Sequence, residues 1–174
     1  GAKHDVAQQA RVLTTLAGTA RVRNVRPAGD LVAALRPLIE GRNDELRAEA
    51  IRLAGIWKLE TFRPAAKAAA LDGNASEKMR RAAVDALASF GGDTSKATLS
   101  RLSTDGPPSI QSAAIAALCG LDLNAAARLA GESFARLSDE TALSEIFTAF
   151  LQRQGGAAAL AKVLASATRQ KHAA

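Results

Sequence analysis

A nine-residue apolar pattern recurs along this 174-residue chain, and an internal repeat constrains the fold more than any other feature of a sequence. Three copies begin at Leu46, Met79 and Ile110, which are 33 and then 31 residues apart. A further shift of 33 residues reaches a weaker fourth copy at Leu143. One such unit exposes most of its apolar face when it is alone, so the spacing predicts units that stack against one another.

Each copy has the pattern of one helix face, with apolar residues at i, i+4 and i+8. The matching columns are Leu46, Met79, Ile110 and Leu143, then Ala50, Ala83, Ala114 and Phe147, and then Ala54, Leu87, Leu118 and Leu151. We interpret the copies as the second helices of helix pairs. Shorter first helices are predicted over residues 30–39, 63–71, 95–102 and 124–137. The apolar content is mainly Ala and Leu with only 3% aromatic residues, which favours helix over strand.

Turns rich in glycine and proline separate the predicted pairs, and Ser76 and either Ser138 or Asp139 are predicted N-caps. The predicted fold class is all-α, a right-handed α–α superhelix of about four to five helix pairs. A globular bundle of about nine helices is the alternative, which the regular spacing disfavours. Since the chain begins with Gly1, we expect it to be a piece of a longer protein. We expect one domain over residues 1–174, with a capping helix at 5–29, repeats at 30–59, 60–92, 93–122 and 123–155, a C-terminal helix at 156–168 and a tail at 169–174.

Residues 76–91 resemble the second helix of a HEAT-like repeat, with an acidic residue, an apolar–Arg pair, alternating Ala and Leu, and a final Gly. Residues 44–55 are similar, whereas Gln111 and Ser144 stand where the third and fourth copies have lost the Arg. The likeness extends over residues 30–164 and implies a HEAT-like, armadillo-type solenoid. It implies a non-catalytic scaffold for protein partners, or a spacer between domains of the same polypeptide.

A narrower resemblance involves residues 20–31 and 53–59, which are similar to helical segments of large multidomain bacterial proteins of the planctomycete and verrucomicrobial type. In that family a β-propeller, dehydrogenase-like portion precedes the repeats and a c-type cytochrome portion follows them. The resemblance implies a secreted or periplasmic parent with a haem-dependent redox function. The chain itself contains no Cys-x-x-Cys-His, which excludes covalent haem attachment within it.

The sequence offers no set of residues for catalysis, and we predict no enzyme, no cofactor and no metal. The only histidines, His4 and His172, lie near the two ends, and the single cysteine, Cys119, is far from both. Two histidines alone do not complete a zinc site. The apolar neighbours of Cys119 favour a small buried residue over a reactive thiol. No apolar run approaches the ~18 residues of a membrane span.

Basic residues are the only functional indication. Residues 1–81 hold 15 Lys and Arg against 9 Asp and Glu, a difference of +6, whereas residues 82–174 hold 8 of each. Arg47 and Arg80 occupy equivalent positions of consecutive copies. One interpretation is structural, in which each Arg bonds a carboxylate or a helix end of the next unit. The other is a basic partner-binding face on the second helices, with the candidates Arg47, Arg52, Arg80, Arg81 and Gln111.

A basic excess of this size is most simply interpreted as a solvated surface. It also fits binding to an acidic protein, a nucleic acid or an anionic membrane surface. We favour a protein partner, because nucleic-acid binders use several exposed aromatic residues and Trp57 is predicted to lie in the core. A HEAT-like nucleic-acid-binding module is the first alternative, and a tetrapyrrole (bilin) lyase-like repeat protein is the second. The compartment is left open, and is periplasmic or secreted if the multidomain resemblance holds.

Overall fold

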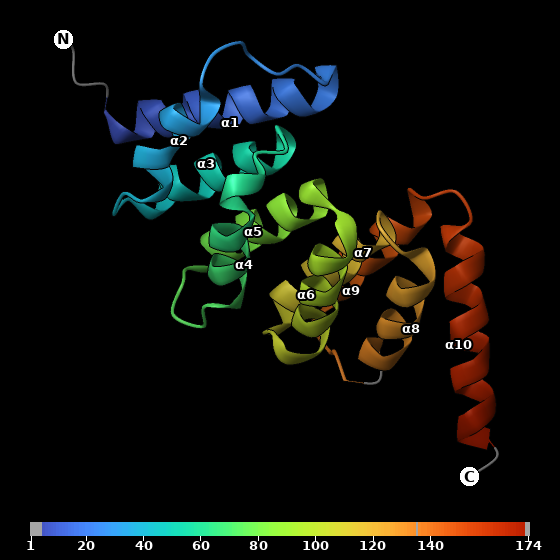
Figure 1. The fold of residues 1–174 in the computed structure, drawn as a ribbon. Helices are drawn as coiled ribbons and strands as arrows, with labels where there is room; N and C mark the ends of the chain where they lie inside the picture. Colours follow the sequence, from blue (N-terminus) through green and yellow to red (C-terminus); the bar gives the residue numbers. More distant parts are fainter. Residues whose placement is uncertain (1–4, 135, 173–174) are drawn as a thin grey trace. The chain divides into compact units, whose positions relative to one another are not determined.

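The computed structural model describes residues 5–134 and 136–172, with side chains as far as residue 165. All regular structure within these residues is helical (Figure 1), which confirms the predicted all-α class. Most predicted helices are found within a few residues of their expected ends. The elements are α1 (Val6–Arg23), α2 (Leu31–Ile39), α3 (Asp44–Ile56), η1 (Glu60–Phe62), α4 (Arg63–Leu71), α5 (Glu77–Phe90), α6 (Gly92–Asp105), α7 (Pro108–Cys119), α8 (Leu123–Phe134), α9 (Glu140–Leu151) and α10 (Gly156–His172).

The helices form two compact units, residues 1–90 and residues 91–174, where the sequence led us to expect one domain. The first unit holds α1 to α5 with η1, and the second holds α6 to α10. Each of the four predicted repeats contains one first helix and one second helix. No helix in the described part of the chain is both long and apolar enough to cross a membrane.

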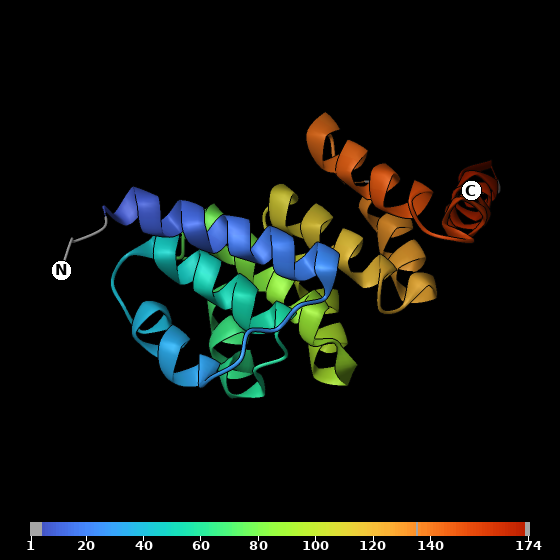
Figure 2. The same cartoon turned by 90° about the horizontal axis from the view of Figure 1, so that it is seen from above.

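In the first unit, the second helices α3 and α5 pack side by side, and α1 packs along α3 (Figure 2). The first helices α2 and α4 pack on α3 and α5 respectively. Small residues make this close packing possible, because Ala50, Ala54 and Ala83 are completely buried. The helices approach closely at Gly55, where the backbone of Ala86 on α5 lies directly against α3.

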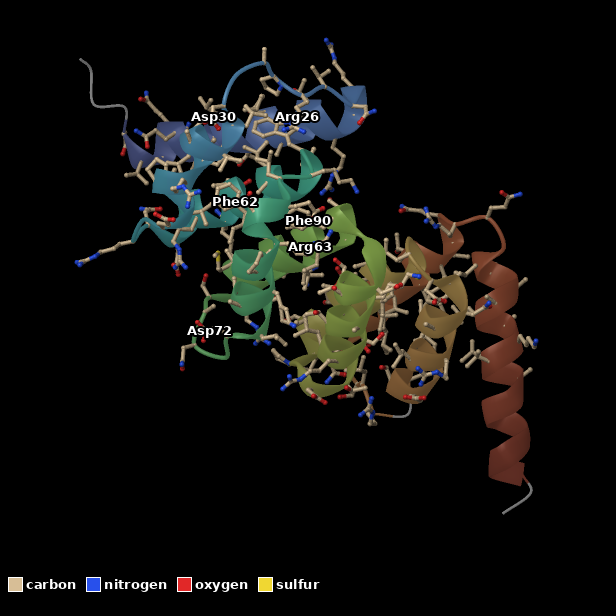
Figure 3. All side chains as sticks on the ribbon, viewed as in Figure 1. Arg26, Asp30, Phe62, Arg63, Asp72 and Phe90 are labelled. Atoms are coloured by element: carbon tan, nitrogen blue, oxygen red, sulfur yellow. The ribbon has the colours of Figure 1, made fainter. Side chains whose placement is uncertain are left out.

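An arginine at the start of α4 contacts the end of α5. The guanidinium carbon of Arg63 lies 4.9 Å from the centroid of the Phe90 ring (Figure 3), a distance typical of a cation–π contact. The same guanidinium donates to the Glu60 carboxylate at 2.7 and 2.9 Å. Hydrogen bonding to Arg63 holds the pKa of the Glu60 carboxyl below its usual range. The contact therefore connects both helices of the second pair with the turn that precedes them.

Side-chain caps begin the second helices where the sequence predicted them. The Ser76 hydroxyl accepts a hydrogen bond from the backbone N–H of Met79 at 3.3 Å. The Asp139 carboxylate accepts from the N–H of Ala142 at 2.8 Å. Asn43 caps α3 in the same way. Each cap satisfies N–H groups that have no partner within the first turn of a helix.

In the second unit, α7 and α9 pack side by side, α6 and α8 pack on α7, and α10 packs on α8 and α9. The caps show that the predicted register of the fourth copy is wrong by one residue. The third residue after the cap is Leu46 in α3, Ile110 in α7 and Ala142, not Leu143, in α9. Consequently Leu143, not Ser144, occupies the position that corresponds to Arg47.

Burial in α9 agrees with the corrected register. Ala142, Ile146 and Phe150 form the buried face, and the last two are completely inaccessible to solvent. The predicted column residues Phe147 and Leu151 are instead 40% and 70% exposed. The error arose because α9 has apolar residues on two adjacent faces, so that periodicity alone fits two registers.

Candidate interaction surfaces

The repeated arginines Arg47 and Arg80 bond the end of the helix that precedes them. The Arg47 Nε donates to the carbonyl of Ile39 at 3.3 Å, and the Arg80 Nε donates to the carbonyl of Ala70 at 3.3 Å. Both acceptors lie in the last turn of the first helix of the same pair. A cation at this place also interacts favourably with the negative end of the helix dipole. The arginines therefore connect the two helices within a pair, rather than one pair with the next.

Gln111 takes the same role in the second unit. Its amide nitrogen donates to the carbonyl of Gly106 at 2.6 Å and to that of Thr104 at 3.4 Å, at the end of α6. The substitution of Arg by Gln in the third copy thus keeps the helix-end bond without a charge. Gln111 belongs to the second unit, whereas the four candidate arginines belong to the first.

Arg52 lies between two carboxylates. Its Nη1 bonds Glu49 of its own helix at 2.7 Å, and its Nε bonds Asp85 of α5 at 3.1 Å. The Glu49 side chain is only 4% exposed, so the ion pair with Arg52 is largely shielded from solvent on the carboxylate side. Burial by itself lowers the pKa of Arg52, but the hydrogen bonds and charges of both carboxylates outweigh it and raise that pKa above its usual value.

Two further contacts join α3 to α5. Lys78 pairs with Glu45 at 2.8 Å near the start of the helices. At their far end, the Lys58 ammonium donates to the carbonyls of Ser89 and Phe90. Arg81 lies on the same face of α5, since it is three residues from Lys78 and four from Asp85. The face of α3 and α5 that the sequence predicted to be basic therefore consists largely of charged side chains that already have ion-pair or hydrogen-bond partners.

Three arginines that the sequence reasoning did not single out lie at the end of α1. Arg21, Arg23 and Arg26 are exposed, and none of them has a side-chain hydrogen bond or ion pair within the described residues. Arg26 lies in the segment that connects α1 with α2 (Figure 3). A sequence signal for them existed, because residues 6–29 contain no Asp or Glu at all.

The segment that holds these arginines is attached to the core. The indole Nε1 of the buried Trp57 donates to the carbonyl of Val25 at 3.2 Å, and the backbone N–H of Val25 donates to Ala20 at 3.3 Å. Val22 and Val25, which alternate with the arginines, are 85% and 50% exposed. We define Arg21, Arg23 and Arg26 as the α1 basic cluster.

Cys119 is a buried residue, as predicted, with 4% of its surface exposed. Burial raises the pKa of its thiol to about 11, and the positive charge of Arg153 offsets this only in part. Since the thiolate is the reactive form, we expect iodoacetamide at about pH 8 to alkylate the folded protein at least about a hundredfold more slowly than free cysteine. Mass spectrometry over time measures the rate. A denaturant should restore fast labelling, and a fast native rate would contradict the buried position.

The described residues contain no group of three His, Cys, Asp or Glu side chains arranged to hold a metal ion.

The helices and their packing make this an all-α repeat protein built of helix pairs. A family model for HEAT repeats matches residues 30–119, which is more than half of the chain, and the chain belongs to the HEAT-repeat family. HEAT repeats generally mediate protein interactions. Neither the curated proteins nor the solved structures contain a match to the chain.

Proposed function

We propose that this chain is a non-catalytic scaffold that binds a protein partner, or a spacer within a larger polypeptide. The family match over residues 30–119 is the observation that supports the proposal. Paired helices that bury one face against their neighbours leave the other faces for contact with other molecules. In this proposal the first unit binds an acidic protein segment.

The charges of the first unit indicate where such a segment would bind. Of the five residues that the sequence suggested, Arg47, Arg52 and Arg80 already bond groups within the unit. The α1 basic cluster is exposed and retains its full capacity for hydrogen bonds with a carboxylate. We therefore propose the α1 basic cluster as the principal contact, while the second-helix candidates Arg47, Arg52, Arg80, Arg81 and Gln111 remain the competing set.

A fluorescent polyglutamate peptide and its polyglutamine counterpart test the proposal by anisotropy. We expect the wild-type protein to bind only the acidic peptide, and to bind it less well as salt rises from about 50 to 200 mM. The triple variant R21Q/R23Q/R26Q should weaken binding about tenfold or more with little change in the thermal midpoint, because these exposed side chains make no hydrogen bond or ion pair with the described residues.

The competing set provides the matched control. The variant R47A/R80A removes two helix-end bonds and should cost about 1 kcal/mol of stability for each, with little change in affinity. The variant R81Q tests Arg81, the half-buried candidate of α5. Loss of affinity in these variants, but not in R21Q/R23Q/R26Q, would assign binding to the second helices. Absence of salt-sensitive binding by the wild type would contradict the acidic partner altogether.

A nucleic-acid partner is distinguished in the same assay. A single-stranded oligonucleotide that binds more tightly than polyglutamate at equal salt would favour the nucleic-acid module. We further propose a place within a multidomain redox protein, which rests on the resemblance of residues 20–31 and 53–59 alone. The visible absorption spectrum of the natural full-length protein tests it, since a haem band is expected and a featureless spectrum would refute it.

A further inference from the structure

The helix α1 lies at one edge of the first unit and differs from α3 and α5 in what covers it (Figure 1). α3 carries the first helix α2, and α5 carries the first helix α4. α1 packs beside α3 in the way that α3 packs beside α5, but within the described residues no first helix precedes it. It therefore occupies the place of a second helix without the first helix that completes a pair.

Apolar side chains are exposed on α1 and in the segment that follows it. Among the described residues, six large apolar side chains are exposed, and four of these lie in residues 6–25. Val12, within α1, is 64% exposed. A single exposed apolar residue is common on protein surfaces, so the surroundings of Val12 decide whether it marks a contact site.

Two hollows flank Val12. The first has a volume of about 410 Å³ and lies between α1 and α2, with Val12, Leu13 and Leu38 as its apolar lining. The second has a volume of about 400 Å³ and lies along α1, where Val12 and Leu16 line it together with Arg11. We name the surface formed by these five residues the α1 groove.

The α1 groove leads along the helix to the α1 basic cluster. Val12, Leu16, Thr19 and Arg23 are spaced by four, three and four residues, and residues with this spacing share one face of a helix. At a rise of ~1.5 Å per residue, about 16 Å of helix separate Val12 from Arg23. Apolar contacts and a positive charge are thus available on one line, about three turns long.

The charge of this face selects the partner. Arg11 borders the groove and Arg23 follows it, and neither has a side-chain hydrogen bond or ion pair with the described residues. Residues 6–29 contain no Asp or Glu. A second copy of α1 would place arginines against arginines in either direction, which opposes self-association. An acidic partner has the complementary charge.

We propose that the α1 groove binds an amphipathic helix of the partner protein, with apolar residues on one face and acidic residues beside them. Apolar side chains enter the hollows on both sides of Val12, and carboxylates pair with Arg11 and Arg23. The bound helix supplies α1 with the cover that α2 gives to α3. The inference rests on the proposed function and specifies that its acidic segment is a helix.

Fluorescence anisotropy with the whole chain and three labelled peptides of equal length and net charge tests the inference. The first peptide is a helix former with leucines that share one face and glutamates beside them. The second has the same residues in scrambled order, and the third has a proline at the centre of the first. We expect the first to bind at least about tenfold more tightly than the others, because only a helix aligns its leucines with both hollows.

The variant V12N removes the apolar side chain between the two hollows. It should weaken binding of the helical peptide about fivefold or more, while affinity for polyglutamate, which lacks apolar side chains, should change less than about twofold. The matched control is V22N, because Val22 lies on the same helix, is 85% exposed and lines neither hollow. Its affinity for the helical peptide should equal that of the wild type, and both variants should keep the thermal midpoint within a few degrees.

Equal binding of the three peptides, or equal affinity of V12N and the wild type for the helical peptide, would overturn the inference. Dimerisation of the wild type in sedimentation velocity, lost in V12N, would assign the groove to a second copy and overturn it as well. Each of these results leaves the acidic-partner proposal standing if the wild type binds polyglutamate in a salt-sensitive way and R21Q/R23Q/R26Q does not. Failure of that polyglutamate assay would instead remove both.

Discussion

Replacing Phe150 with alanine is expected to lower the free energy of unfolding by about 3–5 kcal/mol. The ring is completely buried, and its helix α9 packs against α7 and α10. Truncation removes its apolar contacts and leaves a cavity that the surrounding helices can fill only in part. Urea denaturation followed by circular dichroism measures the loss, provided that the transition remains two-state.

The adjacent Leu151 is the matched control. Its side chain is 70% exposed, and L151A should change stability by no more than about 0.5 kcal/mol. The two variants together test the register of α9, because the periodicity of the sequence had placed Leu151 in the core and the structure places Phe150 there. A larger loss in L151A than in F150A would restore the sequence-based register and contradict the observed one.

Replacing Gly55 with alanine is expected to destabilise the protein by about 3 kcal/mol, the upper end of the range for overpacking. A Cβ atom at this position would lie 2.5 Å from the Cα and 2.8 Å from the carbonyl oxygen of Ala86. Backbone atoms of a packed helix cannot move aside separately, so α3 and α5 would have to separate. The separation would also strain the Arg52–Asp85 ion pair between them. Thermal and urea denaturation measure the change.

Gly18 in α1 offers the control for this substitution. It is also helical, but a Cβ atom there meets nothing within 4 Å. Because alanine is the better helix former, G18A should raise stability by about 0.5–1 kcal/mol. Opposite signs for G55A and G18A are therefore expected. A gain in both variants would show that α3 and α5 do not approach each other as closely as the structure indicates.

The interaction surfaces were only partly predictable. The sequence showed that the first half of the chain is basic, and the equivalence of Arg47 and Arg80 was visible in the repeat. It did not show that both bond the end of the preceding helix, since that acceptor is a backbone carbonyl with no sequence signal. The α1 basic cluster lies in a stretch without acidic residues, but the repeat gives no signal for it because α1 lies outside the repeated copies.

The register of α9 could not be settled from its apolar periodicity alone. With the predicted register, Thr148 does not align with Arg52, whereas with the observed one it does. The N-cap Asp139 supplies the correct alignment, and it was present in the sequence as one of two candidate caps. The choice between Ser138 and Asp139 as the N-cap thus decides the register of α9.

The positions of the helix pairs could be predicted from the sequence alone, because their signals are local. Apolar periodicity, capping side chains and turn residues each depend on residues a few positions apart. Helix packing alone decided which charged side chains of α3 and α5 meet. Arg52 and Asp85 are 33 residues apart in the chain and come together only when the two helices pack. Packing also decided which of two apolar faces of α9 is buried. Both outcomes depend on how closely neighbouring helices approach each other. That approach is determined by side chains that are far apart in the chain.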